Sequence, residues 1–187
     1  MLKLLGEYGK YVEINGFRNV KVEDAKDFLK SLRVDLVNDY EVQLYNADLV
    51  ATWQHLYFAS LNALMAFRTH RNISKTLAVE TVLFASAQRQ IKKAIDLIGI
   101  KPHSANVALI LMSESKESAK AGLSAVSIRI GANVDESVLD LSETKNRNIQ
   151  NAFDISEEEL ESSGPYKLEQ RLVDLIIERV ALLSTRF

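Results

Sequence analysis

The chain of 187 residues contains no cysteine, and this absence removes several classes of function at once. Disulfide bonds, thiolate catalysis and cysteine-ligated metal sites are all excluded. A chain without thiols also suits a reducing compartment such as the cytoplasm. The N-terminal stretch MLKLLGEYGKYVEI lacks the long apolar core of a signal peptide, so we expect none.

Sequence motifs for common enzyme chemistry are missing as well. There is no GxxxxGK[ST], GxGxxG or GxSxG motif, which would cradle a phosphate or carry a nucleophile. His55, His70 and His103 share no i, i+4 spacing and no HExxH motif, so no local zinc site is predicted. We therefore expect a non-enzymatic protein without metal or cofactor, in which His55 is a hydrogen-bonded core residue. The enzymatic alternative is an acid–base pair of His55 and Glu80 in a pocket.

Residues 49–67 carry no formal charge and reach the length of a membrane-spanning helix. Gln54, His55 and Asn62 lie in the interior of this stretch, and each polar side chain would be costly to leave unpaired in lipid. We therefore expect a buried core helix here.

Hydrophobic periodicity predicts a fold of the α/β class: a single mixed domain over residues 1–187, helix-rich with a small central sheet. Strands are predicted as an N-terminal pair with turns, at 41–45 and at 104–113. Helices are predicted at 23–33, from a cap at Asn46 or Asp48 to about Phe67, from Ser74 to Ile98 with a break allowed near Ser86, from Lys116, near 143–152 and over 166–187, with an acidic loop at 156–165.

Charge is segregated along the chain, although the net charge is only −2. Residues 134–178 carry 12 acidic and 4 basic side chains, whereas residues 68–93 carry six basic side chains and one acidic. Such a chain can present one positive face while it stays acidic overall. The alternative is that these charged side chains only form solvent-exposed helix faces without a binding role. The six cations are Arg68, Arg71, Lys75, Arg89, Lys92 and Lys93.

Glu80 shares a helical arc with apolar residues, including Ala87, Ile91, Ala94 and Ile98. A carboxylate in such a place has to be paired or hydrogen-bonded. We expect Glu80 to anchor the start of the helix, for example by pairing with Arg71 or His55.

The C-terminal helix is apolar over more than half of its circumference, which is wider than the stripe of a usual surface helix. One interpretation is a docking surface for another protein, and the other is a helix buried deep in its own fold. The residues that widen the stripe beyond its main face are Val173, Ile177 and Val180.

Asn46-Ala47-Asp48, the following helix with His55, and the stretch NISKTLAVETVLFASAQRQIKKAIDLIGIK resemble the kinase-binding subunit of the KEOPS complex. The similarity covers about residues 46–113. Its most specific part comprises, in order, Ile73-Ser74, Glu80, Arg89-Gln90-Ile91, Ala94-Ile95 and Gly99-Ile100. The similar region contains no short catalytic motif. The resemblance is specific because many residues match in order and spacing across some seventy positions.

The resemblance implies a non-catalytic subunit of the machine that adds the threonylcarbamoyl group to adenosine beside the tRNA anticodon. Such a subunit binds the small atypical kinase/ATPase of the complex and recruits tRNA through the single-stranded 3′ CCA end, in the cytoplasm or, in eukaryotes, also the nucleus. A scaffold without RNA contact is the alternative. From charge clustering we expect the six cations to contact tRNA as one exposed patch, and from the apolar stripe we expect Val173, Ile177 and Val180 to bind the kinase.

Overall fold

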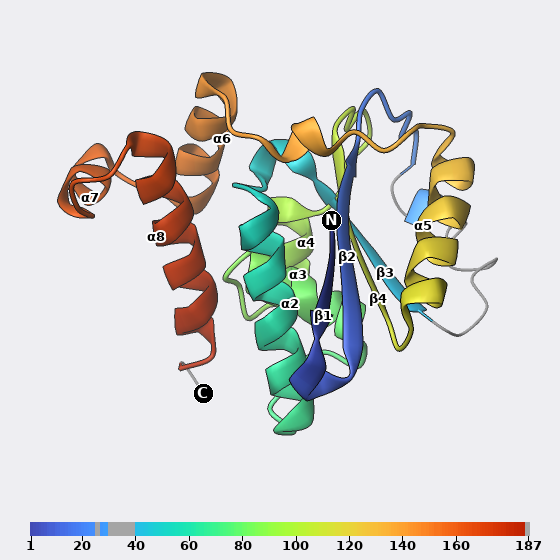
Figure 1. Cartoon of the computed structure of the whole chain (residues 1–187). Helices are drawn as coiled ribbons and strands as arrows, with labels where there is room; N and C mark the ends of the chain where they lie inside the picture. The colour runs from blue at the N-terminus through green and yellow to red at the C-terminus, as the bar shows by residue number, and fades with distance from the viewer. Residues whose placement is uncertain (25–26, 30–39, 186–187) are drawn as a thin grey trace.

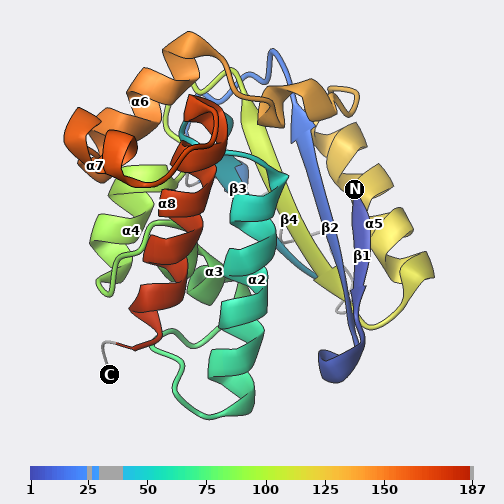
Figure 2. The ribbon, with the colours of Figure 1, turned by 60° about the vertical axis from the view of Figure 1, so that its left-hand side comes forward.

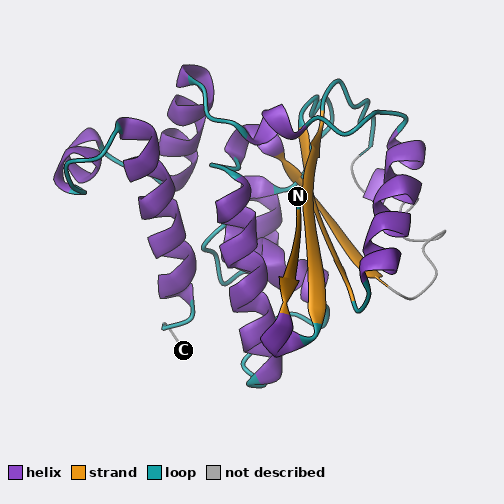
Figure 3. Cartoon of the chain, in the orientation of Figure 1, coloured by secondary structure: helices purple, strands orange, loops and turns teal. Residues whose placement is uncertain are grey.

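An antiparallel sheet of four strands lies at the centre of the computed structural model, which describes residues 1–24, 27–29 and 40–185 (Figures 1 and 3). The strands are β1 (Leu2–Leu5), β2 (Lys10–Phe17), β3 (Tyr40–Asn46) and β4 (Val107–Ser113), in the spatial order β1-β2-β4-β3. The mixed α/β class predicted from the sequence is thereby confirmed.

β4 is an inner strand because it pairs with β2 on one side and β3 on the other, and both of its faces are covered. All seven residues of its sequence VALILMS are buried, which confirms the strand predicted at 104–113. In the ladder, Ile110 lies opposite Ile14 on one side and Gln43 on the other. A continuous apolar run therefore occupies the place in the sheet where no side chain meets water.

Helices cover the two faces of the sheet unequally (Figure 1). α5 (Lys116–Ile130) covers one face and approaches closely at Gly122, where a Cβ atom would stand only 2.6 Å from Leu111 Cδ1. α2 (Trp53–Arg68) and α3 (Leu77–Ala85) cover the other face, and α4 (Ile91–Ile98) packs against α3. α8 (Leu168–Leu183) forms an outer layer against α2, as Figure 2 shows from a second side.

Short elements complete the chain. A 3-10 turn, η1 (Gly6–Tyr8), joins β1 to β2; η2 (Ala47–Leu49) precedes α2, and η3 (Glu136–Leu139) follows α5. α6 (Glu143–Phe153) and α7 (Glu157–Ser162) lead into α8.

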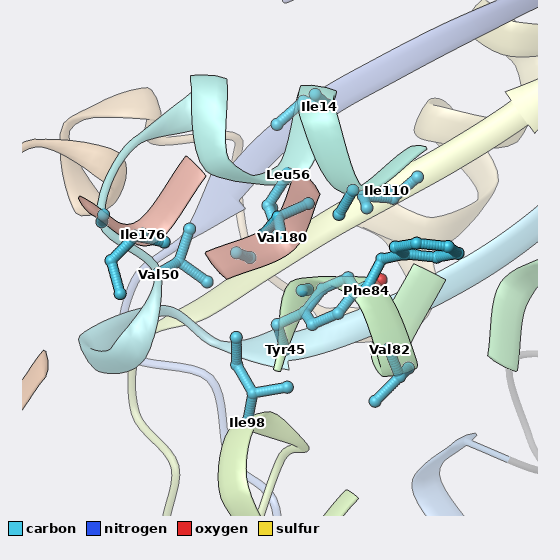
Figure 4. Close-up of a cluster of buried hydrophobic side chains, with 14 of the residues drawn as sticks. Ile14, Tyr45, Val50, Leu56, Val82, Phe84, Ile98, Ile110, Ile176 and Val180 are labelled. Carbon is cyan, nitrogen blue, oxygen red and sulfur yellow. The ribbon is translucent and has the colours of Figure 1, made fainter. Parts of the chain in front are cut away.

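The larger hydrophobic core lies between the sheet and the layer of α2, α3 and α8. Figure 4 shows residues from all of these elements within one cluster, among them Tyr45 of β3, Phe84 of α3 and Val180 of α8. The Tyr45 hydroxyl group lies 2.5 Å from Thr81 Oγ1, so its polar end is satisfied inside the core. Because burial opposes ionisation, the pKa of Tyr45 lies far above its ordinary value of 10.

Several boundaries differ from the sequence predictions. The break near Ser86 is real, since Ser86 ends α3. Ser74 does not cap that helix; the N-cap is Thr76, whose hydroxyl group accepts from the N–H of Val79. Residues 156–165 were predicted as a loop, but they contain the helix α7, which buries Leu160.

The start of the long helix was also placed too early. The Asn46 side chain accepts from the N–H of Asp48 and so caps η2, whereas α2 begins at Trp53. Of the helix predicted at 23–33, residues 27–29 are helical, and residues 25–26 and 30–33 lie outside the described part of the chain.

Candidate nucleic-acid interface and partner surface

Three of the predicted cations, Arg68, Arg71 and Lys75, lie at the turn between α2 and α3, and all three are exposed. We call them the first basic corner. α2 ends at Arg68, and the N–H of Arg71 donates to the Ala66 carbonyl group over 2.8 Å, which folds the chain back. The Arg68 guanidinium group lies 5.6 Å from the centroid of the Tyr8 ring, within the range of a cation–π contact.

Glu80 holds this turn in shape from inside α3. Its side chain is fully buried, and its carboxyl oxygens accept from the N–H of Ser74 over 2.7 Å and from the N–H of Ile73 over 3.1 Å. The expectation of a buried anchor near the helix start is confirmed. The expected partners, Arg71 and His55, were wrong, because the carboxyl group binds backbone donors instead.

The other three cations, Arg89, Lys92 and Lys93, lie where α4 begins, and all three are exposed. We call them the second basic corner. The chain reaches α4 through Ala87, whose positive φ of 51° is unusual for a residue with a side chain. Ile91 was expected on a buried arc but is 40% exposed, because the break after α3 resets the helical phase.

The N-terminus of α4 has the electrostatic character of an anion site. Its N-cap residue, Gln90, makes no side-chain capping bond, and the first turn carries no acidic residue. The N–H groups of this first turn point out of the helix without a helical acceptor, and the helix dipole adds partial positive charge there. Lys92 and Lys93 in this turn repel the same dipole, so this arrangement favours a bound anion such as phosphate.

The two basic corners are separated by α3. The first corner precedes this helix and the second follows it, and its nine residues span about 13 Å. In Figure 2 the turn after α2 lies at the bottom of the molecule and α4 at the left-hand side. The six cations are therefore two exposed groups of three on one run of chain, and a polyanion that bound both would have to extend along α3.

A cleft of about 270 Å³ lies beside the second basic corner. Ser86, Ala87 and Gln88 from the segment before Arg89 form one wall, and the end of α6 forms another. The Arg179 guanidinium group lines the cleft as well, and its Nη2 donates to both carboxyl oxygens of Glu159 over 2.9 Å. The sequence reasoning missed this cleft, since its walls come from distant parts of the chain.

The predicted kinase-binding strip on α8 is mostly part of the core. Val180 is fully buried and Val173 is 6% exposed, whereas Ile177 is partly buried. The apolar surface of α8 is wide because four helices, α2, α3, α6 and α7, pack around it. The expectation that Val173 and Val180 offer a surface is corrected: their side chains are covered. Exposed apolar positions of α8 lie next to Ile177, at Ala181 and at Leu182, which is 40% exposed.

His55 is sealed in the core and held by two hydrogen bonds. Its Nδ1 accepts from the N–H of Ala51 over 3.2 Å, and its Nε2 therefore carries the proton and donates to the Ala85 carbonyl group over 2.7 Å. Burial lowers the pKa of His55 to about 4. Glu80 is equally buried and bonds elsewhere, so these residues do not form an open acid–base pair.

Within the described ranges, no group of three or more histidine, cysteine, aspartate or glutamate side chains could hold a metal ion. Of the helices in those ranges, none is both long and apolar enough to cross a membrane.

Comparisons with known proteins place the chain in a class of binding and regulatory proteins. Residues 17–184 match the model of the family described as kinase binding protein CGI-121. A regulatory protein named Cgi121 from Methanocaldococcus jannaschii is 33% identical over 144 residues, which cover 77% of this chain and 83% of that protein. The chain belongs to the CGI-121 family of kinase-binding proteins.

Proposed function

We propose that this chain is a non-catalytic subunit of the KEOPS machinery for threonylcarbamoyladenosine in tRNA, and that it acts in the cytoplasm, or also the nucleus in a eukaryote. In this role it binds the small atypical kinase of the complex and brings tRNA to it by the 3′ CCA end. Membership of a kinase-binding family supports the first part. The support for the second part comes from the two basic corners.

The observation that carries tRNA binding is the second basic corner. Arg89, Lys92 and Lys93 surround the uncapped start of α4, so side-chain cations and helix dipole act on the same point. A phosphate group fits both, and its binding would release counterions and make affinity fall steeply with salt. The first basic corner can hold further phosphates of a strand that continues past α3.

The cleft next to this corner supports binding of an unpaired strand end. A single strand can turn its bases outward, whereas a duplex keeps them stacked inside. Gln88 supplies amide groups for the edge of a base, and Phe153 supplies an apolar wall. A terminal nucleotide could therefore place its phosphate at the start of α4 and its base in the cleft.

For the kinase we propose the exposed apolar part of α8. Ile177 and Ala181 are four residues apart and lie on one side of the helix. Leu182 follows Ala181 directly and lies about 100° further round the helix. All three lie in the C-terminal half of α8, whereas the glutamate-rich α7 precedes the start of this helix. A small apolar patch with a polar surround is typical of a protein contact.

A titration of the isolated protein with intact tRNA and with tRNA trimmed of its CCA end tests the proposal. We expect trimming to weaken binding. Equal affinity for both RNAs would remove the role of the 3′ end.

The alternative is a protein scaffold that binds the kinase without RNA. Ile91 and Ile95, on the same helix as the lysines, favour it because they are 40% and 47% exposed. Kinase binding without measurable tRNA binding would support this alternative.

A further inference from the structure

A second cleft, of about 600 Å³, lies between α6, α7 and the first turn of α8. Figure 1 shows these three elements gathered at the upper left, away from the sheet. Neither basic corner contributes a residue to this cleft. We refer to it as the acidic cleft, and its lining residues include Asn146, Gln150, Leu160, Leu168 and Arg171.

Carboxylates from all three helices line the acidic cleft. Glu143 comes from α6, Glu157 and Glu161 come from α7, and Glu169 comes from α8; all four are exposed. Residues 154–170 carry six acidic side chains and one basic. Arg147 and Arg171 line the cleft too, so its four glutamates and two arginines give it a net charge of −2. Arg147 Nη2 lies 3.9 Å from Glu143 Oε2, whereas the other three glutamates come from α7 and α8. A cleft focuses this negative potential, which favours a cationic ligand.

The spacing of these carboxylates argues against a metal ion as the ligand. No set of three of them converges as a metal site within the part of the chain that the structure describes. Carboxylates that stand apart are better matched by several separate cations along a flexible chain, such as lysine or arginine side chains. Nucleic acid is excluded by the sign of the charge.

Polar groups in the cleft also lack partners in the described part of the chain. Asn146 is 5% exposed, and its Oδ1 atom accepts no hydrogen bond. The Nε atom of Arg171 donates none. Both atoms are covered from solvent, so their side chains have to rotate before they meet a ligand in the cleft. A peptide unit, which offers an N–H group and a carbonyl group together, would then supply both partners.

Apolar contact is available at the edge of the cleft. Leu168 lines it and is 41% exposed, and Tyr166, two residues earlier, is 62% exposed. An exposed tyrosine beside carboxylates can receive a lysine or arginine by a cation–π contact. Tyrosine is also enriched among the residues that contribute most to binding at protein interfaces.

We propose that the acidic cleft binds a basic, extended segment of a protein partner. Lysine or arginine side chains of this segment pair with the glutamates, its apolar side chains cover Leu168, and its backbone meets the polar groups of Asn146 and Arg171 after a small rotation of their side chains. The site does not depend on the proposed binding of tRNA. It gives the protein two binding regions of opposite charge.

Fluorescence anisotropy with a labelled short peptide of lysine and leucine residues tests the site, with a glutamate-for-lysine peptide as its counterpart. We expect the basic peptide to bind and the acidic peptide not to bind. In the variant Glu161→Gln/Glu169→Gln the affinity should fall about fivefold to tenfold. The matched variant Glu7→Gln/Glu117→Gln changes the net charge equally, elsewhere on the surface, and should bind like the wild type.

Equal weakening in both variants would reduce the effect to net charge and overturn the proposal. Asn146→Leu provides a second test, because it removes the unmet acceptor. This variant should unfold at a higher temperature than the wild type and bind the peptide more weakly. A lower unfolding temperature with unchanged affinity would make Asn146 a structural residue and remove it from the site. Dimerisation through the cleft would replace the peptide by a second copy and also overturn the proposal.

Discussion

The carboxyl group of Glu80 accepts a hydrogen bond of 2.7 Å from the backbone N–H of Ser74, six residues earlier in the chain. The same carboxyl group accepts from the N–H of Ile73. A buried side chain of α3 therefore determines the path of the turn that carries Arg71 and Lys75. The exposed cations of the first basic corner depend on a residue that a ligand never reaches.

Replacing Glu80 should expose this dependence. Glu80→Ala leaves the N–H groups of Ile73 and Ser74 without their acceptor, and we expect the free energy of unfolding to fall by about 2–4 kcal/mol. Glu80→Gln keeps one acceptor oxygen and should lose about half as much. Urea unfolding followed by circular dichroism measures both. Equal stability of Glu80→Ala and the wild type would show that the turn does not need the carboxyl group.

The burial of His55 predicts that the folded protein loses stability in mild acid. Burial lowers its pKa to about 4 in the folded protein, whereas the unfolded chain protonates it near 6.5. Between these two values the unfolded state binds more protons, so the free energy of unfolding falls as pH falls from 6.5 to 4, by up to about 3 kcal/mol. Urea unfolding at a series of pH values tests this, with His55→Gln as control. The variant should be less stable at neutral pH and lose less on acidification; parallel curves would contradict the assignment.

The sequence predicts the elements whose pattern is decided locally. The apolar run of β4 and the break at Ser86 are examples, because burial on both faces and a helix end are read from neighbouring residues. The prediction that Ser74 caps α3 was wrong, because the polar groups of Ser74 have other partners. Its N–H donates to Glu80, and its hydroxyl group donates to the Thr76 carbonyl group. Which hydroxyl group caps a helix depends on these competing partners.

Surfaces are harder to predict than elements. The apolar stripe of α8 suggests either a partner or the core, and only the packing of other helices around Val180 decides for the core. The grouping of six cations follows from the sequence, but their division into two corners follows from the length of α3. The uncapped start of α4 is readable once the helix is known to begin at Ile91, because Gln90 is a poor N-cap residue.

A capping residue at the start of α4 should raise the stability of the protein and weaken its binding of tRNA. In Gln90→Asp, a carboxylate can accept from the N–H groups of the first turn, and we expect the free energy of unfolding to rise by about 0.5–1 kcal/mol. The same carboxylate would repel a phosphate, so tRNA binding should weaken. Gln90→Asn offers a cap without charge and should bind tRNA better than Gln90→Asp. Unchanged tRNA binding in Gln90→Asp would remove the helix start from the interface.

Lys92 and Lys93 predict a measurable salt dependence. If each neutralises one phosphate of a single strand, Lys92→Gln/Lys93→Gln should reduce the slope of log affinity against log salt by about 1.4. Affinity at physiological salt should fall about tenfold. The control Lys116→Gln/Lys120→Gln removes two exposed lysines from α5, on the other face of the sheet, and should leave the slope unchanged. Equal slopes for all three proteins would contradict phosphate contacts at α4.

Ile177 tests where the kinase docks. Its side chain is partly buried beside the exposed Ala181 and Leu182, so Ile177→Asp places a charge at the edge of the proposed contact. We expect kinase affinity to fall at least tenfold, because the carboxylate would lose its water on docking. Leu182→Asp should act likewise at less cost to folding, since Leu182 is 40% exposed. Ile128→Asp, at an 82% exposed position of α5, is the matched control and should bind normally. Calorimetric titration with the purified kinase measures all three, and full affinity in both α8 variants would move the kinase contact to another surface.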